Sequence, residues 1–167
     1  MNQNKEFKVG EKVVYPSHGV GEVISIENQE ISGFALQVYV ISFENDKMTL
    51  RVPVSRASST GLRSVVKQND VQKIYDTLRS RPKQGNRMWS RRAQEYENKI
   101  NSGDLISISE VVRDLFRNVD SDRSYSERTI YESALYRLAS EIAVLEDIDK
   151  ETAVMKLVEV LKEKLAA

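Results

Sequence analysis

The residues best suited to binding chemistry lie in the segment 79–92, which reads RSRPKQGNRMWSRR. The segment holds six basic residues, no acidic residue, and Trp89, the only tryptophan of the chain. Basic side chains neutralise phosphates, and a large flat ring among them stacks on a nucleobase or wedges into a base step. The segment therefore predicts a contact with nucleic acid.

Trp89 also fits a second interpretation, as part of a helix core. Trp89, Ala93, Tyr96 and Ile100 recur at spacings of four, three and four, which is the pattern of one buried helix face. An apolar helix stripe more often packs than binds. The pattern alone favours a core tryptophan, and the nucleic-acid contact remains the alternative.

Residues 48–54 form a second candidate binding element, because apolar and other side chains alternate there. One face of such a strand is core, so Arg51 points to solvent or to a partner. Pro53 has no N–H for a ladder, which places the strand at a sheet edge. An exposed edge is either blunted by charge and proline or used to pair with another protein, and both interpretations stay open. The alternating positions are Met48, Leu50, Val52 and Val54 on one face and Thr49, Arg51 and Pro53 on the other.

The sequence offers little for catalysis or for metal binding. There is no Cys, so neither a disulfide nor a thiol nucleophile is available. His18, the only histidine, lies in a glycine-containing turn without a second base or a third group of a triad. Acidic residues are scattered near expected helix ends, where capping and the helix dipole explain them. We therefore predict a non-enzymatic binding protein with no metal and no cofactor.

Composition and charge describe a soluble globular protein with a dipolar charge distribution. The chain has 167 residues, 40% hydrophobic and 30% charged, which allows one ordinary domain or two small ones. Its net charge is zero, yet residues 1–60 carry −1, residues 61–103 carry +6 and residues 104–167 carry −5. No apolar run approaches about 18 residues, and the first residues lack an apolar export signal. We expect a cytoplasmic protein that does not insert into membranes.

The first third of the chain has the pattern of short strands. It is rich in Val, Ile, Tyr and Phe and is interrupted by glycine, proline and the polar turn at residues 44–46. We predict four or five strands in a small twisted antiparallel sheet or partial barrel. The candidate strands are residues 12–15, 21–31, 36–43 and 48–54.

After residue 61 the hydrophobic period changes to about 3.6, which predicts a compact bundle of four or five amphipathic helices. The first helix spans residues 70–78, and a break at residues 82–85 precedes the second, which spans 87–101 and ends before Gly103. Ser107 with Glu110 forms a capping-box signature for the third helix, Ser126 caps the fourth and Asp149 the last. The apolar positions of these three helices are Val111, Val112, Leu115, Phe116 and Val119; Ile130, Ala134, Leu135, Leu138, Ile142 and Leu145; and Val154, Leu157, Val158, Leu161 and Leu165.

Six motifs together resemble the CarD/CdnL family of bacterial RNA polymerase-binding regulators. They occur in the family's order and spacing and span nearly the whole chain, so the resemblance is specific although each motif alone is weak. The motifs are Phe7-Lys8-Val9-Gly10, Val13-Val14-Tyr15-Pro16 with His18-Gly19, Leu50-Arg51-Val52-Pro53, Trp89-Ser90-Arg91-Arg92, Ser102-Gly103-Asp104 and Glu110-Val111-Val112-Arg113-Asp114-Leu115.

The resemblance implies an α+β protein with two domains. Residues 1–60 are expected to form a Tudor-like domain, similar to the polymerase-interacting module of transcription-repair coupling factor, which adds its edge strand to a lobe of the polymerase β subunit. Residues 61–167 are expected to form a helical domain that meets promoter DNA at the upstream edge of the melted region.

The resemblance also implies roles for single residues. Arg51 matches the family's polymerase-contacting arginine, and the resemblance favours an exposed Trp89, because the first turn of a helix leaves an aromatic protruding even when later residues of its stripe pack. Gln29 and Gln94 stand where some relatives carry basic residues, so their contacts are expected to be weaker or simply polar. The expected polymerase-binding residues are Arg51, Thr49, Pro53 and Gln29, and the expected DNA-binding residues are Trp89, Arg87, Arg91, Arg92 and Gln94.

The predicted function is that of a monomeric transcription factor that docks on the RNA polymerase β subunit and, with the σ factor in place, stabilises the promoter open complex. With about five or six cations facing phosphates, its own DNA affinity should be only ~10⁻⁴ to 10⁻⁶ M, so polymerase must supply the local concentration. Two alternatives are a free-standing DNA-binding repressor, which requires tight binding without polymerase, and a protein adaptor whose basic segment binds an acidic partner.

Overall fold

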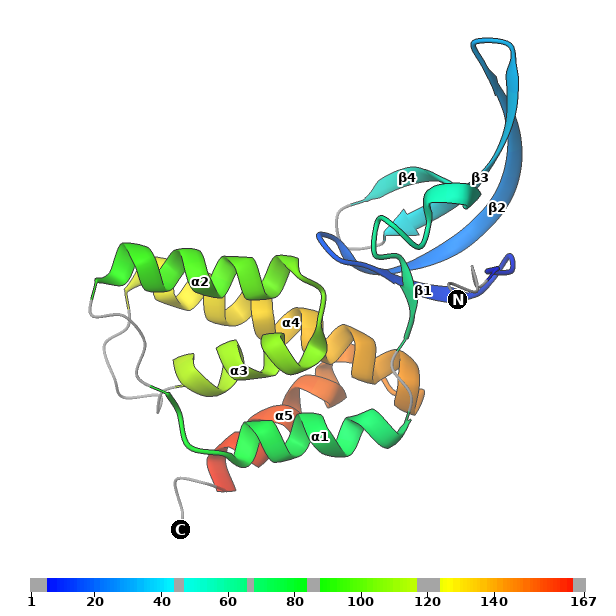
Figure 1. Ribbon diagram of the computed structural model, residues 1–167. Helices are drawn as coiled ribbons and strands as arrows, with labels where there is room; N and C mark the ends of the chain where they lie inside the picture. The colour runs from blue at the N-terminus through cyan, green and yellow to red at the C-terminus, as the bar shows by residue number, and fades with distance from the viewer. Residues whose placement is uncertain (1–5, 44–46, 66–67, 84–87, 117–123, 164–167) are drawn as a thin grey trace. The chain divides into compact units, whose positions relative to one another are not determined.

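The computed structural model describes residues 6–43, 47–65, 68–83, 88–116 and 124–163. The chain divides into two compact units, Met1–Val65 and Val66–Ala167. Within the described residues, the first unit is a five-stranded antiparallel sheet and the second contains five α-helices (Figure 1). The α+β class, with the sheet before the helical bundle, is thereby confirmed.

The sheet has the strand order β4-β3-β2-β1-β5. Its strands are β1 Lys12–Tyr15, β2 Gly19–Ile31, β3 Phe34–Phe43, β4 Met48–Pro53 and β5 Arg63–Ser64. The four predicted strands are present, with ends that differ by at most two residues. β5 pairs with β1, so the sheet includes residues beyond residue 60, where the first domain was predicted to end. β4 is an edge strand, as Pro53 predicts.

One face of the sheet carries the core of the first unit. The residues that form this core are Phe7, Val13, Val23, Tyr39, Ile41, Phe43, Val52, Ala57 and Leu62, and the partly buried Met48 and Leu50 pack against it. A Cβ atom on Gly21 would lie 2.7 Å from Cγ2 of Ile41 and 2.8 Å from Cε1 of Phe43. Only glycine therefore lets these two core side chains reach the backbone of β2.

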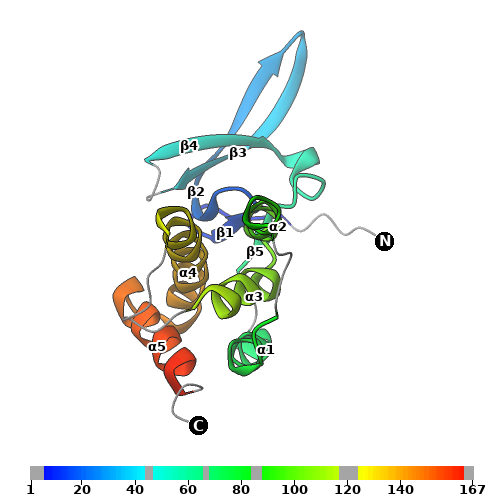
Figure 2. The ribbon, with the colours of Figure 1, turned by 90° about the vertical axis from the view of Figure 1, so that its left-hand side faces the viewer.

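The second unit buries the apolar stripes of its helices against one another (Figure 2). The helices are α1 Gln68–Arg79, α2 Trp89–Asn101, α3 Leu105–Leu115, α4 Tyr125–Glu146 and α5 Lys150–Glu163. α4 packs against α2, α3 and α5, which gives the bundle its core of Leu, Ile, Val and Ala side chains. Within the described ranges, no helix is long and apolar enough to cross a membrane.

Two of the three predicted helix caps are wrong, each by a few residues. Asp104, not Ser107, caps α3, and its carboxylate accepts hydrogen bonds from the Ser107 N–H at 3.2 Å and the Ser107 hydroxyl at 2.9 Å. α3 starts earlier because Gly103, with φ of 73°, ends the α2 segment directly before Asp104. Ser124, not Ser126, caps α4 by accepting from the Glu127 N–H at 3.1 Å.

The cap predicted for the last helix is confirmed. The Asp149 carboxylate accepts a hydrogen bond from the Thr152 N–H at 2.7 Å. Hydrogen bonds from the side chain and the backbone of Thr152 hold the pKa of Asp149 below its usual value. Some predicted features lie outside the described residues, namely the turn at 44–46, Gly85, Arg87, Val119 and Leu165.

Candidate functional site

The exposed edge of the sheet carries Arg51, the predicted polymerase contact. The Arg51 side chain is 52% exposed, and its Nε lies 3.8 Å from an oxygen of Glu27 on β2, whose side chain is 45% exposed. Such a solvated pair contributes little to stability, so Arg51 is free to exchange this partner for another. Thr49 is also exposed, and Pro53 and Gln29 are half-buried.

The strand register places all four predicted polymerase contacts on one face of the sheet. Arg51 lies opposite Val40, which lies opposite Ser25, and Gln29 follows Ser25 by four residues on β2. Because alternate residues of a strand share a face, Thr49, Arg51 and Pro53 of β4 lie on the same side as Gln29. This face is opposite the core of the sheet.

The same face continues onto a two-stranded ribbon at residues 28–37, which extends past the end of β4 (Figure 1). Ser32 and Gly33 both have positive φ, 53° and 82°, as a type I′ hairpin turn requires. At the tip, Ile31 pairs with Phe34, and these side chains are 51% and 72% exposed. Neither residue is among the predicted contacts, although two apolar residues flanking a Ser-Gly turn were the available signal.

Trp89 is the first residue of α2 and is half-buried. Its ring packs against the core of the helical unit, with its centroid 6.3 Å from that of Tyr96. The burial of Trp89 is thus intermediate between the two interpretations of the sequence, because one part of the ring is packed and another part is accessible.

Three other predicted DNA contacts, Arg91, Arg92 and Gln94, lie in the first two turns of α2. Arg91 is exposed, and Arg92 is half-buried with its guanidinium carbon 5.0 Å from the centroid of the Trp89 ring. Gln94 is exposed and donates a hydrogen bond to Oδ1 of Asn98 at 3.0 Å. Arg87 lies outside the described residues. The described members of the set are therefore brought together on one helix end.

A buried ion pair on α3 fixes the chain that leads to α2. Arg113 and Asp114 are about 6% exposed, and Nε of Arg113 donates to Oδ1 of Asp114 at 2.8 Å. Arg113 also donates to the Ser80 hydroxyl at 2.8 Å, and Asp114 accepts from the Lys83 N–H at 3.0 Å. These hydrogen bonds from a buried charge pair hold the segment after α1 in one position. Its signal in the sequence was an Arg-Asp pair inside an apolar helix.

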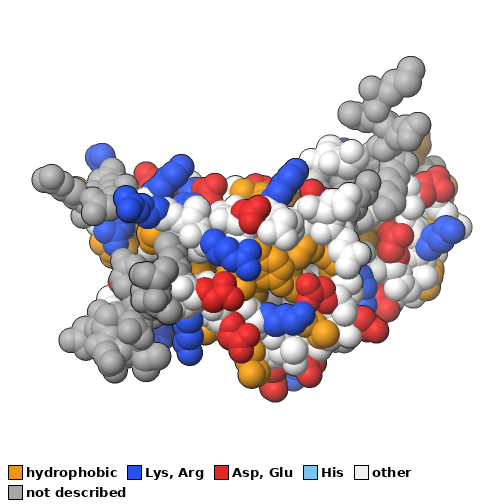
Figure 3. Space-filling model, turned by 90° about the horizontal axis from the view of Figure 1, so that it is seen from below, with side chains coloured by type: hydrophobic (Ala, Val, Ile, Leu, Met, Phe, Trp, Pro, Cys, Tyr) orange, Lys and Arg blue, Asp and Glu red, His pale blue; other side chains and the backbone are white. Residues whose placement is uncertain are grey.

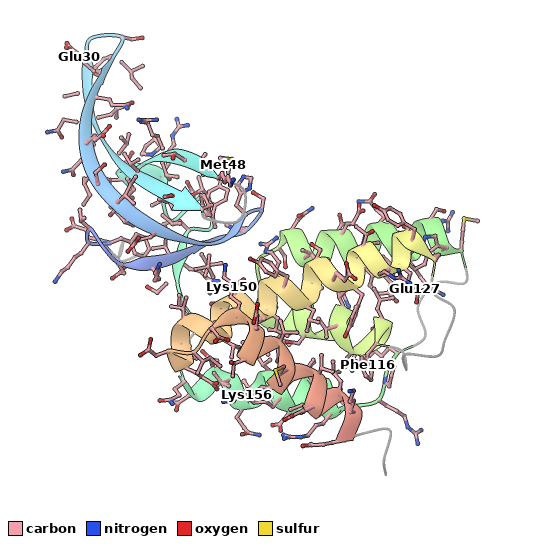
Figure 4. The ribbon with its side chains drawn as sticks, turned by 180° about the vertical axis from the view of Figure 1, so that it is seen from behind. Glu30, Met48, Phe116, Glu127, Lys150 and Lys156 are labelled. Atoms are coloured by element: carbon pink, nitrogen blue, oxygen red, sulfur yellow. The ribbon has the colours of Figure 1, made fainter. Side chains whose placement is uncertain are left out.

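The starts of α2 and α4 lie at the same end of the helical unit in both ribbon views (Figures 1 and 2). Figure 4 places Glu127, in the first turn of α4, at this end. Tyr125, the first residue of α4, is 84% exposed, and Arg128 is exposed one turn later. Aromatic and basic side chains are therefore accessible on two neighbouring helices.

The face formed by α1 and α5 differs, because acidic partners accompany its basic residues (Figure 3). Arg79 lies 3.5 Å from Glu163, and Lys156 lies 2.9 Å from Glu146. The hydrogen bond with Glu146 raises the pKa of Lys156, and burial together with the Glu146 carboxylate raises the pKa of Tyr75. This mixed-charge face is less suited to phosphate than the start of α2.

His18 has a structural environment in the turn between β1 and β2. Its ring lies 5.5 Å from the rings of Tyr15 and Phe43. Among the described residues, no group of three or more His, Asp or Glu side chains is placed to hold a metal ion. The arrangement is that of a packed aromatic side chain.

Two family models cover most of the chain. The CarD-like/TRCF RID domain matches residues 7–66, which span β1 to β5, and the CarD C-terminal domain matches residues 73–158, which span most of α1 to α5. The chain therefore belongs to the CarD family, and the resemblance drawn from the motifs is confirmed. Membership implies regulation of transcription in association with RNA polymerase, in a family that is not known for enzymatic activity.

The chain is also similar to individual proteins. The chain is 30% identical over 143 residues to the Bacillus subtilis (strain 168) protein named "Putative transcription factor YdeB", covering 85% of this chain and 94% of that protein. The solution NMR structure of the 72-residue N-terminal domain of Myxococcus xanthus CarD is 32% identical, with 35% of this chain and 79% of that chain covered and a TM-score of 0.32. CdnLNt from Myxococcus xanthus is 38% identical, with 38% and 90% covered and a TM-score of 0.33.

Proposed function

We propose that this protein docks on the β subunit of RNA polymerase through its sheet and stabilises the promoter open complex through the start of α2. The observation that supports the proposal is that residues expected at each of the two contacts are accessible in a chain of the CarD family. Arg51 is exposed on an edge strand of one unit, and Trp89 and Arg91 begin a helix of the other.

The edge strand β4 supports docking by strand addition. Its outer backbone groups face away from β3, and a strand of the β-subunit lobe would pair with them through main-chain hydrogen bonds. Arg51 and Thr49 share one face of β4, so an acidic side chain on the same face of an added strand would lie beside the Arg51 guanidinium. The ladder supplies affinity, and the arginine supplies specificity.

The start of α2 supports contact with DNA at the edge of the melted region. The accessible part of the Trp89 ring can fill the minor groove or a base step that must restack when the duplex closes. Arg91, which is exposed two residues after Trp89, would contact a phosphate. An indole ring does not read the donor and acceptor pattern of the major groove, so we expect little sequence preference.

The protein acts as a monomer in the cytoplasm, associated with the nucleoid through polymerase. The few cations at the start of α2 support only weak binding to DNA, on the order of 10⁻⁴ to 10⁻⁶ M. Docking on polymerase raises the local concentration of α2 at the promoter, which makes this weak contact effective.

A titration of labelled promoter DNA with and without polymerase tests this function. We expect weak, salt-sensitive binding to DNA alone and saturable binding to the polymerase–promoter complex at far lower concentration. Tight, sequence-selective binding without polymerase would favour a free-standing repressor. Binding to polymerase with no dependence on DNA would favour a protein adaptor.

A further inference from the structure

We propose that Arg92 acts as a positioning residue that holds the ring of Trp89, and that Arg91 alone of the basic pair contacts a phosphate. This inference rests on the proposed function of α2 and assigns different parts to two adjacent arginines. The motif Trp89-Ser90-Arg91-Arg92 contains the two arginines as neighbours in the sequence, whereas in the structure Arg91 is exposed and Arg92 is half-buried.

The geometry of the helix directs Arg92 onto Trp89. The two residues are three positions apart, and helical side chains point back toward the N-terminus, so the side chain of Arg92 covers the preceding turn. Its guanidinium carbon lies 5.0 Å from the ring centroid, within the range of a cation–π contact. Tyr96, one turn further along, also contacts the ring. Two neighbours on one helix thus limit the orientations of the indole.

The hydrogen-bonding state of Arg92 also distinguishes it from Arg91. Nε of Arg92 is buried and has no acceptor within the part of the chain that the structure describes, whereas the Arg91 side chain is exposed. A guanidinium binds phosphate most strongly by presenting two parallel N–H groups outward. With Nε buried, Arg92 cannot use the fork that includes Nε, and its guanidinium lies over the Trp89 ring.

Holding the ring matters because Trp89 lies at the very start of α2. The N-cap residue is Met88, whose side chain makes no capping hydrogen bond. A ring that is already oriented loses less conformational freedom when it binds. Removal of Arg92 should therefore weaken the DNA contact because the Trp89 ring is less well oriented, and not because a positive charge is lost.

The test compares Arg92→Lys and Arg92→Ala with the matched variants Arg91→Lys and Arg91→Ala, all in the full-length chain. Lysine keeps the positive charge but cannot stack as a planar group, so it separates ring positioning from phosphate binding. Three readouts are needed. They are the acrylamide quenching of Trp89 fluorescence, the lifetime of the open complex, and the dependence of that lifetime on salt.

We expect both Arg92 variants to increase quenching of Trp89 and to shorten the lifetime, while the salt dependence remains that of the parent. Arg91→Ala should leave quenching unchanged and reduce the salt slope by about 0.9, the contribution of one phosphate contact. Arg91→Lys should retain most of the lifetime. In a Trp89→Ala background, Arg92→Ala should change the lifetime less than about twofold, because coupled residues are not additive.

Three results would overturn the inference. The first is quenching and an open-complex lifetime with Arg92→Lys equal to those of the parent. The second is a salt slope of the lifetime that Arg91→Ala and Arg92→Ala reduce equally. The third is an Arg92→Ala change that shortens the lifetime in the Trp89→Ala background as much as it does in the parent. If the parent itself fails to lengthen the open-complex lifetime, the proposed function is wrong. The fluorescence measurement still decides in that case whether Arg92 holds the ring.

Discussion

At the scale of single residues, Arg51 combines an exposed charge with a position outside the core. We predict that Arg51→Glu abolishes polymerase binding, because the reversed charge meets the acidic group expected on the partner and lies beside Glu27. The free energy of unfolding should change by less than about 1 kcal/mol, since no core atom is removed. Co-purification with polymerase and urea denaturation measure the two effects.

The matched control for this change is Arg56→Glu. Arg56 is an exposed arginine of the same unit, in the short 3₁₀ helix after β4. It should bind polymerase as the parent does. Retained binding by Arg51→Glu, or equal loss in both variants, would show that the Arg51 face is not the docking surface.

Trp89 is predicted to have an intermediate effect on stability. The ring is half-buried, so Trp89→Ala should lower the free energy of unfolding by about 1–3 kcal/mol. Tyr96→Ala, which removes a buried ring, serves as the core reference and should cost about 3–5 kcal/mol. Urea denaturation compares the two variants. A Trp89→Ala cost equal to that of Tyr96→Ala would mean that the indole is purely structural.

The environments of these residues were predictable from the sequence to different extents. The solvent-facing position of Arg51 followed from strand alternation, which depends only on local geometry. The half-burial of Trp89 did not follow, because it depends on how α2 packs in the bundle and on the rotamer of Arg92. The buried pair of Arg113 and Asp114 was also missed, since its partners Ser80 and Lys83 are about 30 residues away in the chain.

At the scale of elements, the ribbon at residues 28–37 has two different faces. Gln29, Ile31, Phe34 and Leu36 lie on the side of Arg51, while the opposite side carries Asn28, Glu30, Ala35 and Gln37. Within the described ribbon no residue is buried, so it adds nothing to the core of the sheet. An apolar face of this kind beside Arg51 extends the surface proposed to meet polymerase.

We predict that Phe34→Ser weakens polymerase binding by about tenfold, because an exposed aromatic at an interface often contributes more than 1 kcal/mol. The dissociation constant of the purified complex measures the effect. Val9→Ser removes another exposed apolar side chain of the same unit, and it should leave binding unchanged. A lower melting temperature for Phe34→Ser would show instead that the protein itself covers this side chain.

The elements themselves were largely predictable, whereas two of the helix caps were not. Strands and helices followed from hydrophobic periods of two and about 3.6, which persist over many residues. Caps depend on single hydrogen bonds and on the preceding turn. The sequence favoured Ser107 with Glu110 at the start of α3, but the left-handed Gly103 before Asp104 moved the start earlier.

At the scale of the whole molecule, the chain combines two units that each have a core of their own. Among the described residues, the core cluster of the sheet unit contains nine buried residues, from Phe7 to Leu62. We therefore predict that a fragment of residues 1–65 folds and binds polymerase without the helices. Circular dichroism and NMR test folding, and co-purification tests binding. An unfolded fragment would show that the sheet depends on the helical unit.

The central claim is that one chain joins a polymerase contact to a DNA contact. In the proposed mechanism neither contact alone would lengthen the life of the open complex, because the DNA contact would be weak without polymerase and the polymerase contact would not touch the melted DNA. Arg51 and Trp89 should therefore both be required, and for different reasons.

The most direct measurement of this claim is the lifetime of a promoter open complex with the parent protein, with Arg51→Glu and with Trp89→Ala. The account predicts a longer lifetime with the parent and none of that gain with Arg51→Glu, even at concentrations that saturate the parent. It predicts that Trp89→Ala still binds polymerase but gives a shorter lifetime than the parent. A Trp89→Ala protein that binds polymerase and lengthens the lifetime as much as the parent would contradict the account.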